Sequence, residues 1–169
     1  MVGIIDVSVP IRPGMVTYPG DPTVTLERVR SIAGGQGYNL SRLDFGVHSG
    51  THVDAPVHFI DGAPAAESLP VDVLIGPCVV VDGIRVPQAA ERVLFKTRNS
   101  ELWARETFAE EFESLDGRTA QALVAGGVRL VGIDYLSIGD EDAHRVLLGP
   151  ASSRSKASTC APSTRAITS

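Results

Sequence analysis

The chain has few of the features that mark several large classes of protein. Of its 169 residues only two are cysteine and 5% are aromatic, which argues against a disulfide framework and against a base-stacking surface. Acidic residues outnumber basic ones by 20 to 15, so nucleic acid is not an expected partner. No apolar run is long enough to cross a membrane, and no basic residue precedes such a run near the N-terminus. We therefore expect a cytoplasmic protein with no membrane partner, in which Cys78 is buried as a small apolar residue.

The chain does contain a dense group of potential metal ligands. Residues 48–59 read His-Ser-Gly-Thr-His-Val-Asp-Ala-Pro-Val-His-Phe, so three of the four histidines and one aspartate lie within eleven positions. Imidazole and carboxylate bind divalent metals such as zinc and manganese, and a further histidine can move protons. An ordinary polar surface turn is the alternative, but it explains a single histidine better than four donor groups together.

The residues around this group predict an extended but bent segment. Leu43, Phe45 and Val47 alternate with polar residues or glycine, which is typical of a strand buried on one face. A straight strand would hold His48 and His58 roughly 33 Å apart, at about 3.3 Å per residue, so one site requires bends. Glycine and proline make bends most favourable at positions 50 and 56. The same residues disfavour a helix that pairs His48 with position 52.

The rest of the chain reads as a mixture of strands and a few helices. Valine and isoleucine enrichment or alternation predicts strands at 4–9, 24–32, 40–48, 78–81, 93–96 and 129–134. Helices are expected at 106–115 and at 119–124, the second capped near Asp116. The glycine-rich stretch 34–37 lacks the lysine of a phosphate loop and is interpreted as a hairpin connection. This pattern favours an α/β or α+β class.

Residues 48–59 resemble the His-x-Gly-Thr-His-x-Asp-x-Pro-x-His-Phe signature of the cyclase-like metal hydrolases. That family includes bacterial kynurenine formamidases and isatin hydrolases. The resemblance extends over about residues 4–148, with segments 5–8, 17–22, 93–97, 130–134 and 143–145 in the family's order. It implies a swivelling β/β/α fold and a homodimer or larger assembly.

The resemblance also implies a set of site residues. A binuclear centre would have His48, His52 and Asp54 on one metal, Asp54 bridging, and His144 on the second, with His58 as the acid/base. Taken alone, His144 would be a surface or capping histidine. Tyr18 resembles an aromatic residue that lines the substrate pocket, although it could equally be a turn residue packed on its neighbouring proline.

The expected chemistry is hydrolysis of a small-molecule amide. One or two ions of zinc or manganese would activate a water molecule, and His58 would transfer its proton to the leaving nitrogen. The expected substrate is an N-formylkynurenine-like formamide, another small amide or a lactam. The alternative is an inactive, truncated family member that folds or binds metal without turnover.

The last nineteen residues differ in character from the rest. Segment 151–169 contains nine serine or threonine residues and no acidic residue, a composition that cannot bury a core. We therefore divide the chain into a C-terminally truncated hydrolase domain at 1–150 and a low-complexity tail, expected to be disordered, at 151–169. A Glu-Gly-Leu stretch that the family carries here is missing. A shifted reading frame is our hypothesis, because back-translated codons can restore that stretch with its glutamate across Ser155 and Lys156. A natural low-complexity tail is the alternative.

Overall fold

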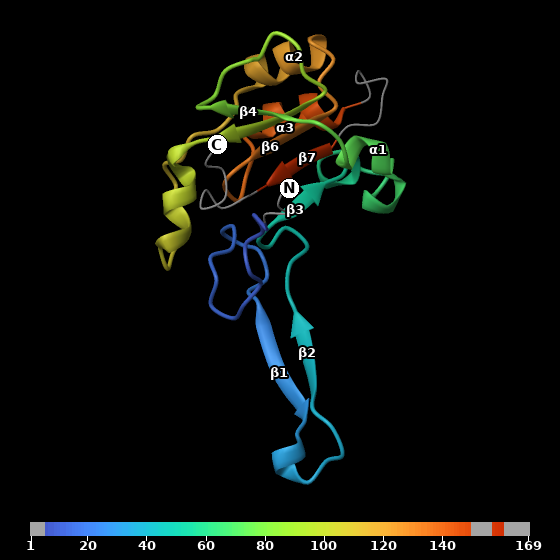
Figure 1. The fold of residues 1–169 in the computed structure, drawn as a ribbon, viewed down its shortest axis with the longest axis vertical. Coiled ribbons are helices and arrows are strands. Elements are labelled where there is room, and N and C mark those ends of the chain that lie inside the picture. Colours follow the sequence, from blue (N-terminus) through green and yellow to red (C-terminus); the bar gives the residue numbers. More distant parts are fainter. Residues whose placement is uncertain (1–5, 150–156, 161–169) are drawn as a thin grey trace, which may run out of the picture.

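The computed structural model describes residues 6–149 and 157–160. Figure 1 shows a body, built from a sheet with helices packed against it, from which a long two-stranded arm extends. The fold is of the mixed α/β class that the sequence predicted.

The body is organised around a five-stranded sheet with the strand order β3-β7-β6-β5-β4. The parallel strands are β4 (Val79–Asp82), β5 (Arg92–Lys96), β6 (Leu130–Ile133) and β7 (Ala157–Cys160), and β3 (His52–Asp54) pairs antiparallel with β7. Strands β4, β5 and β6 read as short, mainly apolar runs, which are typical of parallel strands, although β4 lies at the edge of the sheet and buries only Val81. Their ranges confirm the strands predicted at 78–81, 93–96 and 129–134.

Two helices cover one face of the sheet. Helix α2 (Gly117–Ala125) begins where the Asp116 carboxylate accepts a hydrogen bond from Thr119 N, which confirms the predicted cap. Helix α3 (Glu141–Leu148) begins in the same way at Asp140, whose carboxylate accepts from Ala143 N at 2.7 Å. Apolar residues of both helices join the sheet in the main core, which comprises Val81, Val93, Phe95, Leu115, Ala120, Leu123, Val128, Val131, Ile133, Ile138, Ala143 and Leu147.

Shorter helical elements complete the body. Helix α1 (Val71–Leu74) packs Val73 against Leu69, Ala55 and Leu130 in a second apolar cluster. The 3-10 helices are η1 (Ile32–Gly34), η2 (Pro56–His58), η3 (Ala66–Ser68) and η4 (Arg98–Ala104).

The arm is an antiparallel hairpin of β1 (Thr25–Arg30) and β2 (Leu40–Asp44), joined through η1 and the glycine-rich stretch as predicted. Every residue of both strands is exposed. Leu26 lies opposite Leu43, and they are 55% and 47% exposed. We expected Leu43, Phe45 and Val47 to form a buried face. In a single chain all three side chains are exposed, so this expectation was wrong. The alternation is present, but the arm extends away from the body that would cover it (Figure 1).

Two of the predicted elements did not form. Residues 6–9, the described part of the strand predicted at 4–9, are irregular, and Val9 N donates to Thr51 Oγ1 instead of to a neighbouring strand. Segment 106–115 is a loop and not the predicted helix, although its apolar spacing suits one. Its backbone groups bond to distant partners: Ala109 N donates to the Tyr135 hydroxyl, and Glu113 N donates to Asn99 Oδ1. These tertiary bonds replace the bonds of a helix.

Three further expectations concern the tail, the cysteine and the membrane. Residues 157–160 form strand β7, whereas we expected no regular structure there; the rest of segment 151–169 lies outside the described residues, and the division at residue 150 stays a prediction. Cys78 is exposed and not buried, because it precedes the first residue of β4 at the rim of the sheet. Among the described residues no helix is long and apolar enough to cross a membrane.

Candidate functional site

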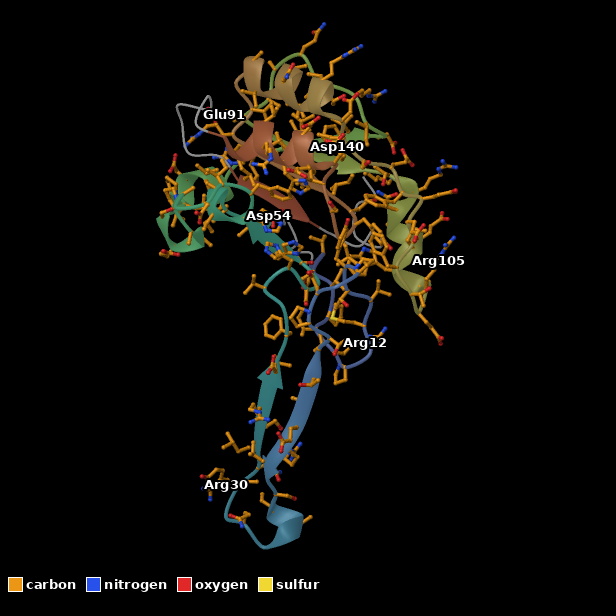
Figure 2. All side chains as sticks on the ribbon, turned by 180° about the vertical axis from the view of Figure 1, so that it is seen from behind. Arg12, Arg30, Asp54, Glu91, Arg105 and Asp140 are labelled. Carbon is orange, nitrogen blue, oxygen red and sulfur yellow. The ribbon has the colours of Figure 1, made fainter. Side chains whose placement is uncertain are left out.

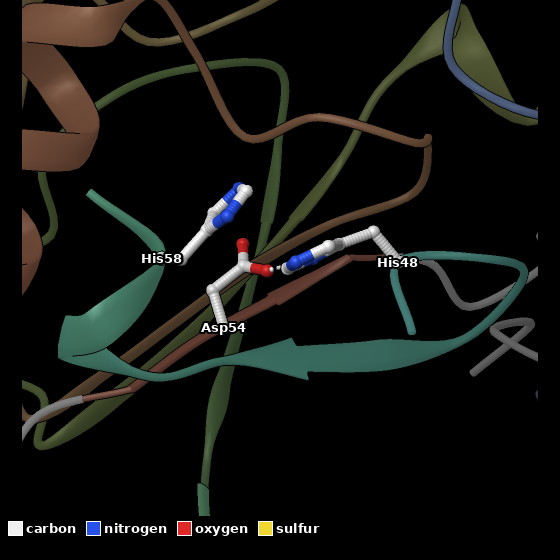
Figure 3. Close-up of side chains that lie close together, drawn as sticks. All are labelled: His48, Asp54 and His58. Carbon is white, nitrogen blue, oxygen red and sulfur yellow. Dashed lines mark ion pairs between the residues drawn. The ribbon is translucent and has the colours of Figure 1, made fainter. Parts of the chain in front are cut away.

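The segment that carries the histidines bends at the two predicted places. Gly50 has φ 61°, a left-handed conformation, and a Cβ there would lie 2.6 Å from Ile11 Cδ1. Pro56 begins helix η2, which turns the chain back after β3. The two bends bring His48, from the loop before β3, and His58, at the end of η2, to the carboxylate of Asp54, which lies between them in Figure 3.

Asp54 is the buried centre of the cluster. Its side chain is only 2% exposed, and its Oδ1 atom lies 2.7 Å from His48 Nδ1 and 3.5 Å from His52 Nε2. Burial alone would raise the pKa of this carboxyl, but the hydrogen bonds with His48 and His52 lower it well below its usual range. Asp54 is therefore ionised at neutral pH in the middle of three imidazoles.

His48 and His58 differ in their affinity for protons although their rings are stacked, with centroids 3.8 Å apart. The hydrogen bond with Asp54 raises the pKa of His48 above its usual value. Burial lowers the pKa of His58 below its usual value. Two neighbouring titratable groups whose pKa values are pushed apart are typical of an acid/base site. Of the two, His58 is the imidazole that binds its proton more weakly.

His52 and His144 are each oriented by a backbone carbonyl. The Nδ1 atom of His52 lies 2.9 Å from Gly50 O, and that of His144 lies 2.8 Å from Asp140 O. A proton on Nδ1 that is donated to a carbonyl leaves Nε2 free to bind a metal or accept a proton. His144 is only 4% exposed, so it is not a surface histidine, and its ring centroid lies 6.0 Å from that of His58.

These side chains line a cavity of about 560 Å³. It lies in the body close to where the arm begins, since Figure 2 shows Asp54 there and Arg30 toward the far end of the arm. Tyr18 lines the same cavity, and its ring meets Phe108 edge-on at 5.0 Å. A volume of this size suits a small ligand. Tyr18 is therefore placed to contact such a ligand and does not merely pack within its own turn.

The donor set fits a divalent metal. One ligand atom from each of His48, Asp54 and His58 lies within 4.8 Å of the other two. No lysine or arginine is among the described residues that line the cavity, whereas Asp21, Asp140 and Glu141 are. The buried Asp54 carboxylate thus lies among imidazoles, in a cavity whose lining includes other acidic side chains. A divalent cation bound there would neutralise their negative charge.

The structure brings all six predicted site residues to one cavity: His48, His52, Asp54, His58, His144 and Tyr18. Its tightest donor group includes His58 and not His52, whereas we expected His52 as the ligand and His58 as the acid/base. The roles of these residues stay predictions. Sequence reasoning assigned no role to Phe59 or Asp21, which line the same cavity. Phe59 follows His58 directly within the motif, and this position was the available signal.

Comparisons with known proteins match this fold and site. The sequence model of the Cyclase family matches residues 5–92, which include the whole histidine motif. A kynurenine formamidase from Erythrobacter litoralis (strain HTCC2594) is 31% identical over 161 residues, covering 86% of this chain and 74% of that protein.

Solved structures of other proteins are similar to this chain in fold. A predicted metal-dependent hydrolase from Bacillus stearothermophilus superposes with a TM-score of 0.74 at 28% identity, over 97% of this chain and 84% of its own. Isatin hydrolase A from Labrenzia aggregata superposes with a TM-score of 0.75 over 95% and 80% of the two chains. Because the identity is 16%, this likeness concerns the fold alone.

Proposed function

The chain belongs to the Cyclase family, and from this premise we propose that it is a metal-dependent hydrolase of a small amide, formamide or lactam. The formamidase relative favours a formamide that resembles N-formylkynurenine. The single observation that carries the proposal is the ionised Asp54 carboxylate, buried among three imidazoles at the wall of a cavity large enough for such a substrate.

We propose that His48, His52 and Asp54 hold a first ion and that His144 takes part in holding a second. A divalent ion in such a site supplies a water whose pKa is lowered to about 7 and polarises the carbonyl under attack. The donor set of imidazole and carboxylate suits both zinc and manganese. Asp54, whose Oδ1 atom is approached by both His48 and His52, would be the ligand shared by the two ions.

His58 is the proposed acid/base. Because burial lowers its pKa, the imidazole is neutral at pH 7 and can accept a proton from the attacking water. It can then donate the same proton to the leaving nitrogen of the amide. His58 lies at the end of η2, where it lines the cavity and its ring is stacked on that of His48.

Tyr18 is the proposed contact for an aromatic substrate ring. Asp21 N donates to Tyr18 O at 3.0 Å, which closes a tight turn with Gly20 at φ 93°. Phe108 supports the Tyr18 ring from the side. A ring that is held by a turn and a second aromatic side chain loses little freedom when a substrate stacks on it.

We also propose that the protein acts as a homodimer in the cytoplasm, with the arm contributing to the interface. A two-stranded hairpin is at best marginally stable alone, and the apolar face with Leu26 and Leu43 is uncovered within one chain. The opposite face carries an ion pair between Glu27 and Arg42 at 2.8 Å and is suited to water. Light scattering should give the mass of a dimer, and Leu43→Glu should give the mass of a monomer; a monomeric wild-type protein would rule out this assembly.

A second candidate is a folded family member that binds metal without turnover. It is favoured by segment 143–169, which contains no acidic residue where the resemblance implies a glutamate, about twelve residues after His144. The shifted reading frame would explain this absence. If the nucleotide sequence holds no Glu-Gly-Leu in the shifted frame beyond residue 150, that explanation fails.

Metal analysis combined with turnover separates the two candidates. The purified protein should contain zinc or manganese and hydrolyse N-formylkynurenine or isatin, and His58→Ala should lose turnover but keep metal. Gln88→Ala, an exposed loop substitution, is the matched control and should behave as wild type. Metal without turnover in the wild-type protein would favour the inactive member and refute the hydrolase.

A further inference from the structure

Phe59 lies between two histidines that come from distant parts of the chain. Its ring is stacked on His144, with centroids 4.3 Å apart and an interplanar angle of 21°. The same ring meets His58 edge-on, with centroids 4.5 Å apart and an interplanar angle of 79°. Phe59 therefore touches both the motif at residues 48–58 and helix α3.

The backbone of Phe59 is also fixed to α3. Arg145, the residue after His144, donates from Nη1 to Phe59 O at 3.0 Å. The same guanidinium forms an ion pair with Glu141, one turn earlier on the helix, at 2.8 Å. A planar guanidinium that is held by two partners has little freedom to rotate. Arg145 thus clamps the end of η2 to α3.

These contacts determine where the two imidazoles point. The His144 ring is fixed at Nδ1 by Asp140 O and on one face by Phe59, so the direction of its Nε2 is set. The His58 ring is held between Phe59 at its side and the stacked His48 ring. Without the Phe59 ring, both imidazoles would gain rotational freedom toward the cavity.

We infer that Phe59 is a positioning residue, which sets the separation and orientation of His58 and His144 while the Arg145 clamp fixes its backbone. This inference deepens the proposed function and rests on it where metal binding and turnover are concerned. Groups that orient the ligands of a metal site change metal affinity or activity by about 10-fold to 100-fold when they are removed. A loss of that size is the expected effect at Phe59.

The test uses the full chain and observes the histidines directly. Only four histidines are present and all four lie at the site, so their ring signals can be followed by NMR in the metal-free protein. Phe59→Leu should move the His144 signals downfield, because a stacked ring shields them in the wild type. It should also weaken Zn²⁺ binding, measured by competition with a chromophoric chelator, by about 10-fold to 100-fold. Phe59→Tyr keeps an aromatic ring and should restore both properties.

Two substitutions serve as controls and one as a second probe. Phe112→Leu removes an aromatic side chain that packs on Phe108 and Tyr135, away from the histidines, and should change neither property. Arg145→Gln removes only the clamp, from a side chain that is 54% exposed, and should shift the same signals without unfolding the chain. Arg98→Gln, at another exposed ion pair, is its matched control.

The possible results of these experiments lead to different conclusions. Unchanged His144 signals and unchanged Zn²⁺ affinity in Phe59→Leu and Arg145→Gln would overturn the inference. So would a loss of all four histidine signals together that Phe59→Tyr does not reverse, because it would indicate a role in folding only. If the predicted shifts occur but the wild-type protein hydrolyses no amide, the positioning role stands and the hydrolase proposal fails.

Discussion

Replacing Asp54 by asparagine tests the metal site with little change in volume. The substitution removes the negative charge that Oδ1 presents to His48 at 2.7 Å and to His52 at 3.5 Å. It also removes the charged oxygen from the group of three donor atoms within 4.8 Å. The cluster that remains has imidazole ligands but no carboxylate.

The expected loss can be worked out from this geometry. A hydrogen bond to a charged group contributes about 1.5–3 kcal/mol, and we take the upper end of that range for the contact of the buried Asp54 carboxylate with a metal ion. At about 1.4 kcal/mol for each factor of ten, metal affinity should fall by about 100-fold. In excess metal, a 100-fold weaker affinity removes about 2.7 kcal/mol of ligand-induced stability. For a chain of this length that corresponds to a melting temperature lower by roughly 5–11 °C in the presence of metal.

The assay is thermal unfolding with and without Zn²⁺, after removal of metal by a chelator. The quantity to compare is the rise in melting temperature that metal causes, because this difference separates affinity from effects of the substitution on folding. Asp61→Asn, at an exposed residue outside the cavity lining, is the matched control and should keep the full rise. If Zn²⁺ raised the melting temperature of Asp54→Asn as much as that of the wild-type protein, our assignment of Asp54 to the metal site would be refuted.

Three further substitutions test other parts of the structure. Gly50→Ala forces a left-handed conformation on alanine, which costs roughly 1–2 kcal/mol, and places its Cβ against Ile11. Denaturant unfolding should show this loss in the free energy of unfolding, and turnover should also fall because the motif shifts. Gly139→Ala would place a Cβ against a backbone carbonyl, so its free energy of unfolding should fall by about 1–3 kcal/mol, and an unchanged value would contradict this packing. Thr97 donates two hydrogen bonds to Asp134, and burial raises the pKa of that carboxyl. The stabilising contribution of Asp134 is therefore complete below about pH 3.9, the pKa of the unfolded state, and is lost as the pH rises through the raised pKa of the folded state. Asp134→Asn should therefore become more stable relative to wild type as the pH rises above about 4, and a flat difference between pH 3 and pH 7 would exclude this.

The features that the sequence predicted correctly are local ones. Strands β4 to β6 were predictable because each is a short, mainly apolar run, as parallel strands often are, although β4 is a largely exposed edge strand and only β5 and β6 are mostly buried. The cluster of His48, Asp54 and His58 was predictable because a segment of eleven residues with bends at glycine and proline must bring its side chains together.

The features that were missed depend on contacts between distant segments. Helix α3 is eight residues long and begins with two acidic residues after its cap, Asp140, so it carries a cap signal but too few apolar positions for its period to be recognised. Its His144 reaches the site only because the sheet order places α3 beside the motif. Segment 106–115 has helical spacing, but hydrogen bonds with Tyr135 and Asn99 hold it in another conformation. Such tertiary bonds leave no signal in a local pattern.

The arm shows a different limit of sequence reasoning. Alternation of Leu43, Phe45 and Val47 with polar residues predicted a strand at 40–48, and β2 comprises only residues 40–44 of it, so Phe45 and Val47 lie beyond its end. The alternation could not show whether the covering surface belongs to the same chain. The exposure of these side chains in one chain is the physical reason for the wrong expectation of burial.

The strand order of the sheet has a consequence for the timing of synthesis. Strand β3, which carries His52 and Asp54, is an edge strand whose neighbour in the sheet is β7, more than a hundred residues later. Strands β4, β5 and β6 can pair as soon as residue 133 has left the ribosome, whereas β3 waits for residues 157–160. At about 5–20 residues per second, roughly 5–20 s pass between the synthesis of Asp54 and that of its neighbouring strand. During that interval the nascent chain presents its histidines on an unanchored segment, so stable capture of a metal ion is expected only after residues 157–160 have been synthesised.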